Sequence, residues 1–121
     1  MNWEIELYSK ENKSCPVLEF ILELTPKQQA KIQRKIDLLE EFGTNLLYPH
    51  TKKLEGKEFK DLWELRIKLS TDSFRIFYFI SVGKKIVLLH AIKKKTDKTP
   101  IKELEISINY MKDYLRRVNK K

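Results

Sequence analysis

The chain has 121 residues, a formal net charge of +8 and one cysteine. This length suits one domain, residues 1–121, with a hydrophobic core that needs neither disulfides nor a structural metal as support. A lone cysteine excludes an internal disulfide, and no apolar run reaches the roughly 18–20 residues of a membrane span. Because the first residues also lack the pattern of a signal peptide, we expect a cytoplasmic protein with no membrane contact.

The positive charge is concentrated toward the C-terminus. Residues 1–83 carry 13 Lys and Arg and 13 Asp and Glu, whereas residues 84–121 carry 12 Lys and Arg and 4 Asp and Glu. Such an uneven distribution favours a polyanionic partner, either nucleic acid or an acidic protein. A solvated basic face that serves solubility is the alternative interpretation.

The N-terminal part predicts one strand and a helical hairpin. Residues 3–8 alternate apolar and polar side chains, which is the period of a half-buried strand. Residues 16–42 show helical spacing of apolar side chains and predict two helices, the second of which begins with a capping box formed by Thr25 and Gln28. Gly43 ends the second helix, because a left-handed residue is common at that position.

The next part predicts a three-stranded antiparallel sheet. Residues 44–59 form a polar connection, and the apolar alternation of residues 62–69 and 74–80 marks two strands. Residues 86–93 are almost entirely apolar, as expected of a strand with both faces covered. The connections between these strands are so short that they require hairpins, and the predicted order is therefore a β-meander.

A C-terminal amphipathic helix is expected over residues 101–118, where apolar side chains recur every three or four positions. Thr99 and Pro100 mark its start, with Thr99 as the capping residue. The predicted fold class is therefore α+β. An N-terminal strand and helical hairpin pack on an antiparallel meander, and an amphipathic helix follows.

The sequence lacks the motifs of common enzyme sites. It contains no phosphate-binding glycine loop, no GxGxxG and no nucleophile elbow. Two widely separated histidines and one cysteine form no zinc pattern, and no carboxylate pair suggests magnesium or glycosidase chemistry. We therefore predict no metal and no cofactor. His50, in a polar connection, is interpreted as incidental rather than as a catalytic base, and His90 as a hydrogen-bonded core histidine.

Arg66 and Arg75 are the most informative residues, because each lies in an otherwise apolar strand where an unpaired charge is costly. One interpretation is a structural ion pair with Glu64 or Asp72. The other is a concave face that gathers guanidinium groups and lysines to hold a phosphate. The aromatic side chains of the same strands are interpreted as core rather than as base-stacking platforms: Trp63, Phe77 and Phe79.

Five segments together resemble a known family. They are Lys53-Leu54-x-Gly56, Leu62-Trp63-Glu64-Leu65-Arg66, Phe74-Arg75-Ile76-Phe77-Tyr78, Leu89-His90-Ala91-Ile92-Lys93-Lys94-Lys95 and Lys98-Thr99-Pro100. The combination is similar to HigB-like toxins of the RelE/ParE superfamily of bacteria and phages, and the resemblance spans residues 50–118. It implies a compact RelE-like domain that acts as the toxin of a type II toxin–antitoxin system.

The resemblance further implies a metal-independent endoribonuclease that cuts mRNA on the ribosome and inhibits translation. In such a reaction the ribose 2′-OH attacks the adjacent phosphate, which requires a base, an acid and cations around the phosphate. The implied catalytic residues are Arg66 and Arg75 as phosphate-stabilising cations, Lys93 and Lys94 as acid or phosphate contacts, and Glu64 as general base where RelE-type enzymes have a lysine. The implied RNA contacts are Lys53, Lys68, Lys95 and Lys98.

The same superfamily also contains inhibitors of DNA gyrase. A ParE-like non-enzymatic gyrase inhibitor is therefore the alternative function, with the basic segment Arg116–Lys121 as its working surface. The partners that the resemblance implies are the ribosome and mRNA, and a HigA-like helix-turn-helix antitoxin. Operator DNA would be bound only through that antitoxin.

Overall fold

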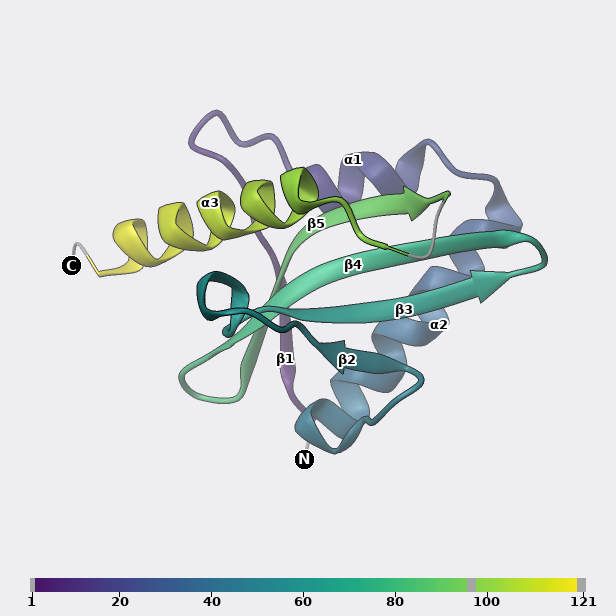
Figure 1. The fold of residues 1–121 in the computed structure, drawn as a ribbon, viewed down its shortest axis with the longest axis horizontal. Helices are drawn as coiled ribbons and strands as arrows, with labels where there is room; N and C mark the ends of the chain where they lie inside the picture. The colour runs from purple at the N-terminus through teal and green to yellow at the C-terminus, as the bar shows by residue number, and fades with distance from the viewer. Residues whose placement is uncertain (1, 96–97, 120–121) are drawn as a thin grey trace.

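The computed structural model describes residues 2–95 and 98–119, which form a five-stranded mixed sheet with helices on both faces (Figure 1). The strand order is β1-β5-β4-β3-β2. Consecutive antiparallel pairing of β3 (Trp63–Leu69), β4 (Asp72–Ser81) and β5 (Lys85–Lys94) confirms the predicted meander. The predicted α+β fold class is confirmed.

Two short strands complete the sheet at its edges. β1 (Glu4–Leu7) pairs parallel with β5, and β2 (Thr51–Lys53) pairs antiparallel with β3. β1 was predicted from its alternation, whereas β2 lies inside the segment that was predicted to be a connection. Three polar residues carry no apolar periodicity, so only pairing with β3 reveals β2 as a strand. Thr51 is nevertheless buried, and its hydroxyl donates to the carbonyl of Leu46 at 2.8 Å.

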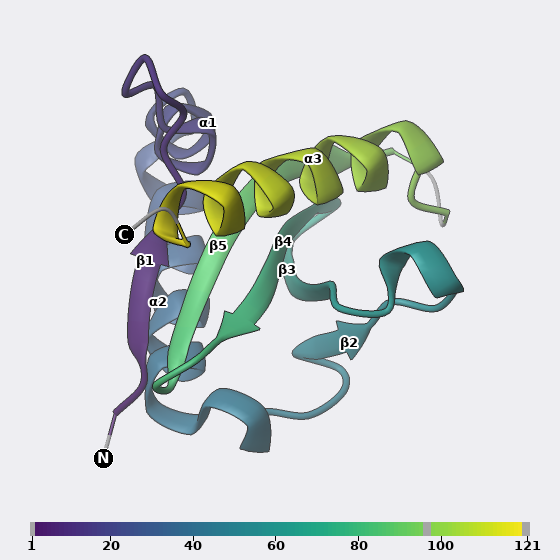
Figure 2. The same cartoon turned by 90° about the vertical axis from the view of Figure 1, so that its left-hand side faces the viewer.

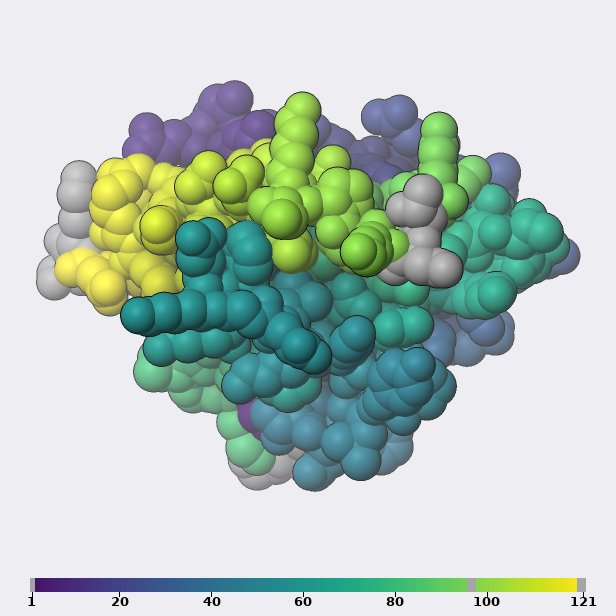
Figure 3. Space-filling model, viewed as in Figure 1, coloured from purple at the N-terminus to yellow at the C-terminus, as the bar shows by residue number. Residues whose placement is uncertain are grey.

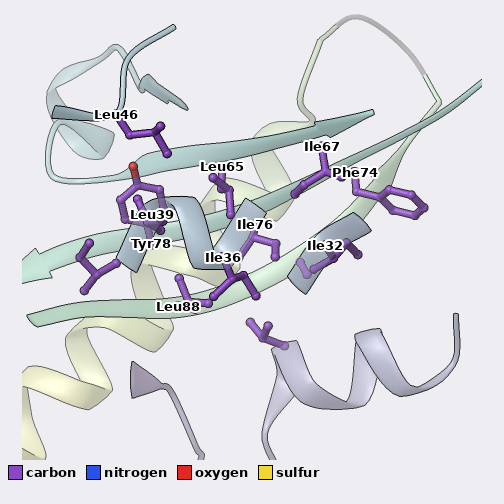
Figure 4. Close-up of a cluster of buried hydrophobic side chains, with 13 residues drawn as sticks. Ile32, Ile36, Leu39, Leu46, Leu65, Ile67, Phe74, Ile76, Tyr78 and Leu88 are labelled. Atoms are coloured by element: carbon purple, nitrogen blue, oxygen red, sulfur yellow. The ribbon is translucent and has the colours of Figure 1, made fainter. Parts of the chain in front are cut away.

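The helices cover the two faces of the sheet unequally. α1 (Pro16–Leu22) and α2 (Pro26–Phe42) pack on one face, and α3 (Ile101–Val118) crosses the other (Figure 2). The larger core lies between the sheet and the helical hairpin, where Ile32, Leu39 and Phe74 are fully buried (Figure 4). A smaller core lies beneath α3. Because α3 packs on β5 and β4, the part of this face that belongs to β3 is left uncovered.

The ends of α2 follow the predicted chemistry. Thr25 Oγ1 accepts a hydrogen bond from the Gln28 amide at 3.2 Å, and the Gln28 side chain accepts one from the Thr25 amide at 3.0 Å, which confirms the capping box. Gly43 ends the helix with φ of 52°. The Trp3 ring packs so closely against it that an added Cβ would lie 2.1 Å from ring atoms.

The predicted cap of α3 is wrong. The helix begins at Ile101 as expected, but the capping residue is Pro100 and no side chain accepts from the first turn. The C-terminal half of α3 is held instead by Asp113, which accepts from Tyr8 Oη at 2.6 Å and from Arg117 at 2.9 Å. The contact with Tyr8 joins α3 to the segment that follows β1, whereas the contact with Arg117 lies within the helix. Within the described residues, no helix has the length and apolar character that a membrane span requires.

A bulge in β5 decides which side chains of this strand face which layer. Phe77 pairs with His90 and Tyr78 with Leu88, so Leu89 has no counterpart in β4. Because an extra residue reverses the alternation beyond it, the last lysines of β5 change faces. Lys94 therefore lies on the same face of the sheet as Arg75, whereas Lys93, opposite Phe74, lies on the face of the helical hairpin.

Replacement of Gly43 by alanine tests the close approach of Trp3. We expect Gly43→Ala to lower the free energy of unfolding by roughly 2 kcal/mol or more, because it adds backbone strain and displaces the ring. Gly83→Ala is the matched control, since Gly83 has φ of 76° but no atom within 4 Å of its added Cβ. Urea denaturation measures both, and equal losses would contradict the packing of Trp3 on Gly43.

The anchor of α3 predicts a pH-dependent contribution to stability. Hydrogen bonds from Tyr8, Arg116 and Arg117 hold the pKa of Asp113 below its ordinary value. A lowered folded-state pKa stabilises the protein above the ordinary carboxyl pKa of about 3.9, and this stabilisation is lost as the pH falls through the folded-state pKa. Asp113→Asn should therefore destabilise the protein at neutral pH and progressively less below about pH 4 in urea titrations. A loss of stability that is equally large in acid would contradict the ionic anchor.

Candidate functional site

The uncovered part of the α3-side face is a broad open cavity of about 1000 Å³. Its wall includes β3, β4, the end of β5 and the start of the segment that leads into α3, and it continues to α2 and the connection before β2. Figure 3 shows this side of the molecule, with α3 and the chain around the 3₁₀ turn Lys57–Phe59 in front of the sheet. The cavity is strongly cationic. The basic residues that line it are Lys31, Lys35, Lys52, Arg66, Lys68, Arg75, Lys94, Lys95 and Lys98.

Three charged side chains form the centre of the cavity. The β3–β4 register places Arg66 directly opposite Arg75, and Glu64 lies two residues before Arg66 on the same face of β3. Glu64 Oε2 is 3.4 Å from Arg66 Nη1 and 3.4 Å from Arg75 Nε. Arg75 Nη1 also donates to the Ser73 hydroxyl at 2.8 Å and to the Phe74 carbonyl at 2.9 Å. The predicted ion pairs with Glu64 are therefore present.

Burial makes this group of charges unusual. The side chains of Glu64 and Arg75 are 5% and 8% exposed, whereas that of Arg66 is 26% exposed and reaches the cavity. Burial lowers the pKa of Arg75, Glu64 counteracts this, and Arg66 lowers it further. An arginine keeps its proton in a protein, so the group carries two positive charges against one negative charge. The excess positive charge faces a cavity, which suits an anionic ligand.

The structure brings most of the predicted site residues together. Lys68, Lys94, Lys95 and Lys98 line the same cavity as Glu64, Arg66 and Arg75. Lys93 does not line it, because the β5 bulge turns its side chain to the other face. There Lys93 Nζ lies 3.2 Å from Asp72 Oδ1 and lowers the pKa of this carboxyl, so Asp72 pairs with Lys93 and not with either arginine.

Lys53 also lies outside this cavity. Its ammonium is 5.7 Å from the centre of the Trp63 ring, and it borders a second, smaller hollow of about 420 Å³ near the end of α3. The neighbouring Lys52 lines the main cavity. In the β2–β3 register it lies opposite Glu64, so the two side chains are on the same face of the sheet. Which of these two adjacent lysines faces the cavity depends on the register of β2 with β3. The sequence could not indicate this register, because β2 was not predicted as a strand.

Among the charged and aromatic residues of the cavity, sequence reasoning missed three besides Lys52. Lys31 and Lys35 come from α2, and Tyr48 comes from the connection before β2. The four-residue spacing of Lys31 and Lys35 was a visible signal, but nothing in the sequence places this helix face next to β3. Tyr48 is 69% exposed, and the Arg66 guanidinium lies over its ring at 5.1 Å.

The two histidines lie in different surroundings, and neither lines the cavity. His90 Nε2 lies 2.7 Å from Glu103 Oε1 and its ring stacks on Phe77, so it is a hydrogen-bonded histidine under α3, as predicted. His50 does not line the cavity, although its Nδ1 is 2.7 Å from Lys35 Nζ. Phe77 and Phe79 are buried, in agreement with their interpretation as core.

The basic end of α3 is occupied by intramolecular contacts. Arg116 and Arg117 both pair with Asp113, and Arg116 also lies 3.3 Å from Glu11. Lys120 and Lys121, the remaining part of the surface expected for a gyrase inhibitor, lie outside the described residues. Within residues 2–95 and 98–119, no cluster of His, Cys, Asp and Glu has the arrangement of a metal site.

The fold is an α+β fold compatible with a compact RelE-like domain, and its sheet carries a cationic cavity. The family model described as phage-derived protein Gp49-like (DUF891) matches residues 19–112, and the chain belongs to this family. The Gp49-like family is associated with toxins of type II toxin–antitoxin systems, which also implies an antitoxin partner. A comparison with curated proteins finds no match.

The shared carboxylate predicts how the site responds to loss of one charge. We expect Glu64→Met to lower the free energy of unfolding by about 3–5 kcal/mol, because it leaves Arg75 buried without a counter-ion. The double variant Glu64→Met/Arg75→Met should recover part of this loss, since no buried charge then remains unpaired. Urea denaturation of the two variants provides the measurement. A double variant less stable than the single variant would contradict the role of Glu64 as the counter-ion of Arg75.

Proposed function

We propose that this protein is a HigB-like toxin that cleaves mRNA on the ribosome without a metal ion. The observation that carries the proposal is the pair Arg66 and Arg75 on one carboxylate, Glu64, inside a cavity whose other charged residues are all lysines. A phosphodiester is the anion that such a set of cations suits, because guanidinium groups can bind two phosphate oxygens at once. Membership of a family associated with toxins supports the same assignment.

The proposed chemistry is transfer of the phosphoryl group to the neighbouring ribose oxygen. The 2′-oxygen forms a bond to phosphorus, and the bond from phosphorus to the 5′-oxygen of the next nucleotide breaks. The products are a 2′,3′-cyclic phosphate and a 5′-OH. Negative charge on the five-coordinate phosphate grows during the reaction, and preorganised cations of the cavity stabilise it.

The cavity offers a residue for each step. Arg66, the more exposed arginine, contacts the phosphate, and Arg75 adds its charge from below. Glu64 is the one carboxylate among the described residues that line the cavity, and it accepts the proton of the 2′-OH. Lys94 is the lysine of β5 that lines this cavity, and its ammonium protonates the 5′-oxygen as it leaves.

The proposal extends to partners. A HigA-like helix-turn-helix antitoxin neutralises the toxin, and operator DNA is bound only through that antitoxin. The ribosome presents the mRNA, which places the activity in the cytoplasm. Gyrase inhibition has less support as the function, because the described arginines at the end of α3 are paired with Asp113, whereas Lys31, Lys35 and Lys52 of the cavity form no ion pair with a described residue.

Adjacent lysines of β5 provide a matched test. After induction in cells, the wild-type protein should create new 5′-OH ends inside reading frames, and Arg66→Ala and Lys94→Gln should reduce them by about 10²–10³-fold. Lys93→Gln changes the net charge equally but affects the opposite face, and it should retain cleavage. Mapping of mRNA 5′ ends is the measurement. Growth arrest with intact mRNA would refute the endonuclease, and a supercoiling assay would then test gyrase inhibition.

A further inference from the structure

The cationic cavity continues past the edge of the sheet. β2 pairs with β3 only between Trp63 and Leu65, and the last contact on this side is the hydrogen bond from the Arg66 amide to the His50 carbonyl at 2.8 Å. From Ile67 onward, β3 has no neighbouring strand on this side. The cavity extends through this open edge to the other face of the sheet, because its lining includes side chains of α2, which packs on that face.

A chain of contacts leads from the centre of the cavity to α2. The Arg66 guanidinium lies over the ring of Tyr48, as described above, and Tyr48 belongs to the same short segment as His50. His50 Nδ1 is in turn 2.7 Å from Lys35 Nζ. This segment therefore bridges the phosphate-binding arginines and the basic side of α2. Tyr48 lies between Arg66 and the basic side of α2, and its side chain is mostly exposed.

The basic side of α2 is arranged at a cost to the isolated protein. Lys31 and Lys35 are four residues apart on the helix, a spacing at which like charges repel each other. Burial lowers the pKa of Lys35, and Lys31 lowers it further. Neither lysine forms an ion pair with a described residue, and Lys27 continues the row one turn earlier. Such unpaired like charges next to a cationic cavity suit an extended polyanion.

We propose that Lys31 and Lys35 bind phosphates of the same single-stranded RNA whose scissile phosphate lies at Arg66 and Arg75, and that a base stacks on Tyr48 between them. This inference rests on the proposed RNA substrate and extends it from one phosphate to a strand that crosses the edge of β3. The face of Tyr48 not covered by Arg66 receives the base, because aromatic rings accept any base by stacking. Lysines grip the flanking phosphates as point charges without reading sequence.

The length of the RNA provides the first test. Oligouridylates with 2′-O-methyl groups cannot be cleaved by 2′-OH attack, and fluorescence anisotropy measures their affinity when they are roughly three or roughly nine nucleotides long. We expect the wild-type protein to bind the longer RNA more tightly. Lys31→Gln/Lys35→Gln should lose this gain and should reduce the slope of log K against log salt by about 1.4 for the longer RNA, since each phosphate contact on a single strand contributes about 0.7.

The control has the same net charge. Lys102 and Lys112 are exposed on α3 outside the cavity, and Lys102→Gln/Lys112→Gln should keep the gain and the slope of the wild type. A wild type with no dependence on length, or equal losses in the two double variants, would overturn the inference. If the α2 variant loses affinity for ribosomes but keeps the gain with length, the phosphates belong to ribosomal RNA and the shared strand is also refuted.

Tyr48 is tested by its ring and its hydroxyl separately. Tyr48→Phe should retain the affinity for the longer RNA, whereas Tyr48→Ala should lower it roughly 5- to 150-fold, as expected for removal of one stacked base. Wild-type affinity in Tyr48→Ala would refute the stacking platform. The proposed function is judged independently by the mapped 5′-OH ends. If cleavage depends on Arg66 but not on Lys31, Lys35 or Tyr48, this inference is refuted and the proposed function stands.

Discussion

The site depends on one buried carboxylate that two arginines share. Glu64 neutralises only one of the two positive charges that the β3–β4 pairing brings together, and it is itself almost inaccessible to water. Without it, Arg75 would be a buried cation beside another cation, which is among the most costly arrangements in a protein interior. With it, both guanidinium groups keep a defined position, and the uncompensated charge is presented to the cavity. The structural and the functional interpretations of these arginines are therefore compatible, because the ion pair that holds them is what orients them.

The shape of the site follows from the unequal cover of the sheet. The helical hairpin packs an apolar core onto one face, whereas α3 packs mainly on β5 and the adjoining part of β4 on the other. The hydrogen bond from Tyr8 to Asp113 fixes the C-terminal half of α3 toward the β1 edge of the sheet. The strands toward the other edge stay open, and their polar face becomes the floor of the cavity. A helix that crossed the whole face would have covered these polar residues of β3 and β4 and left no room for a ligand.

The lysines around the floor of the cavity repel one another when no ligand is bound. Like charges on β3, β5, α2 and the segment before α3 repel one another across a shared cavity, and each lysine must be held near the others by the fold. A polyanion that enters the cavity removes this repulsion and releases the counter-ions that had accumulated there.

Sequence alone determined the meander, the hairpin, the C-terminal helix and the position of Arg66 and Arg75 within two neighbouring strands, because these depend on periodicity, on turn length and on charges in apolar strands. It did not determine which neighbouring lysine reaches the site. Lys94 rather than Lys93 lines the cavity because one extra residue in β5 reverses the alternation, and Lys52 rather than Lys53 does so because of its pairing with β3. Lys31, Lys35 and Tyr48 joined the site only through packing across the open edge of β3. Local patterns specify elements, but the face of each side chain near a bulge, an edge or a crossing helix is set by contacts between residues far apart in the chain.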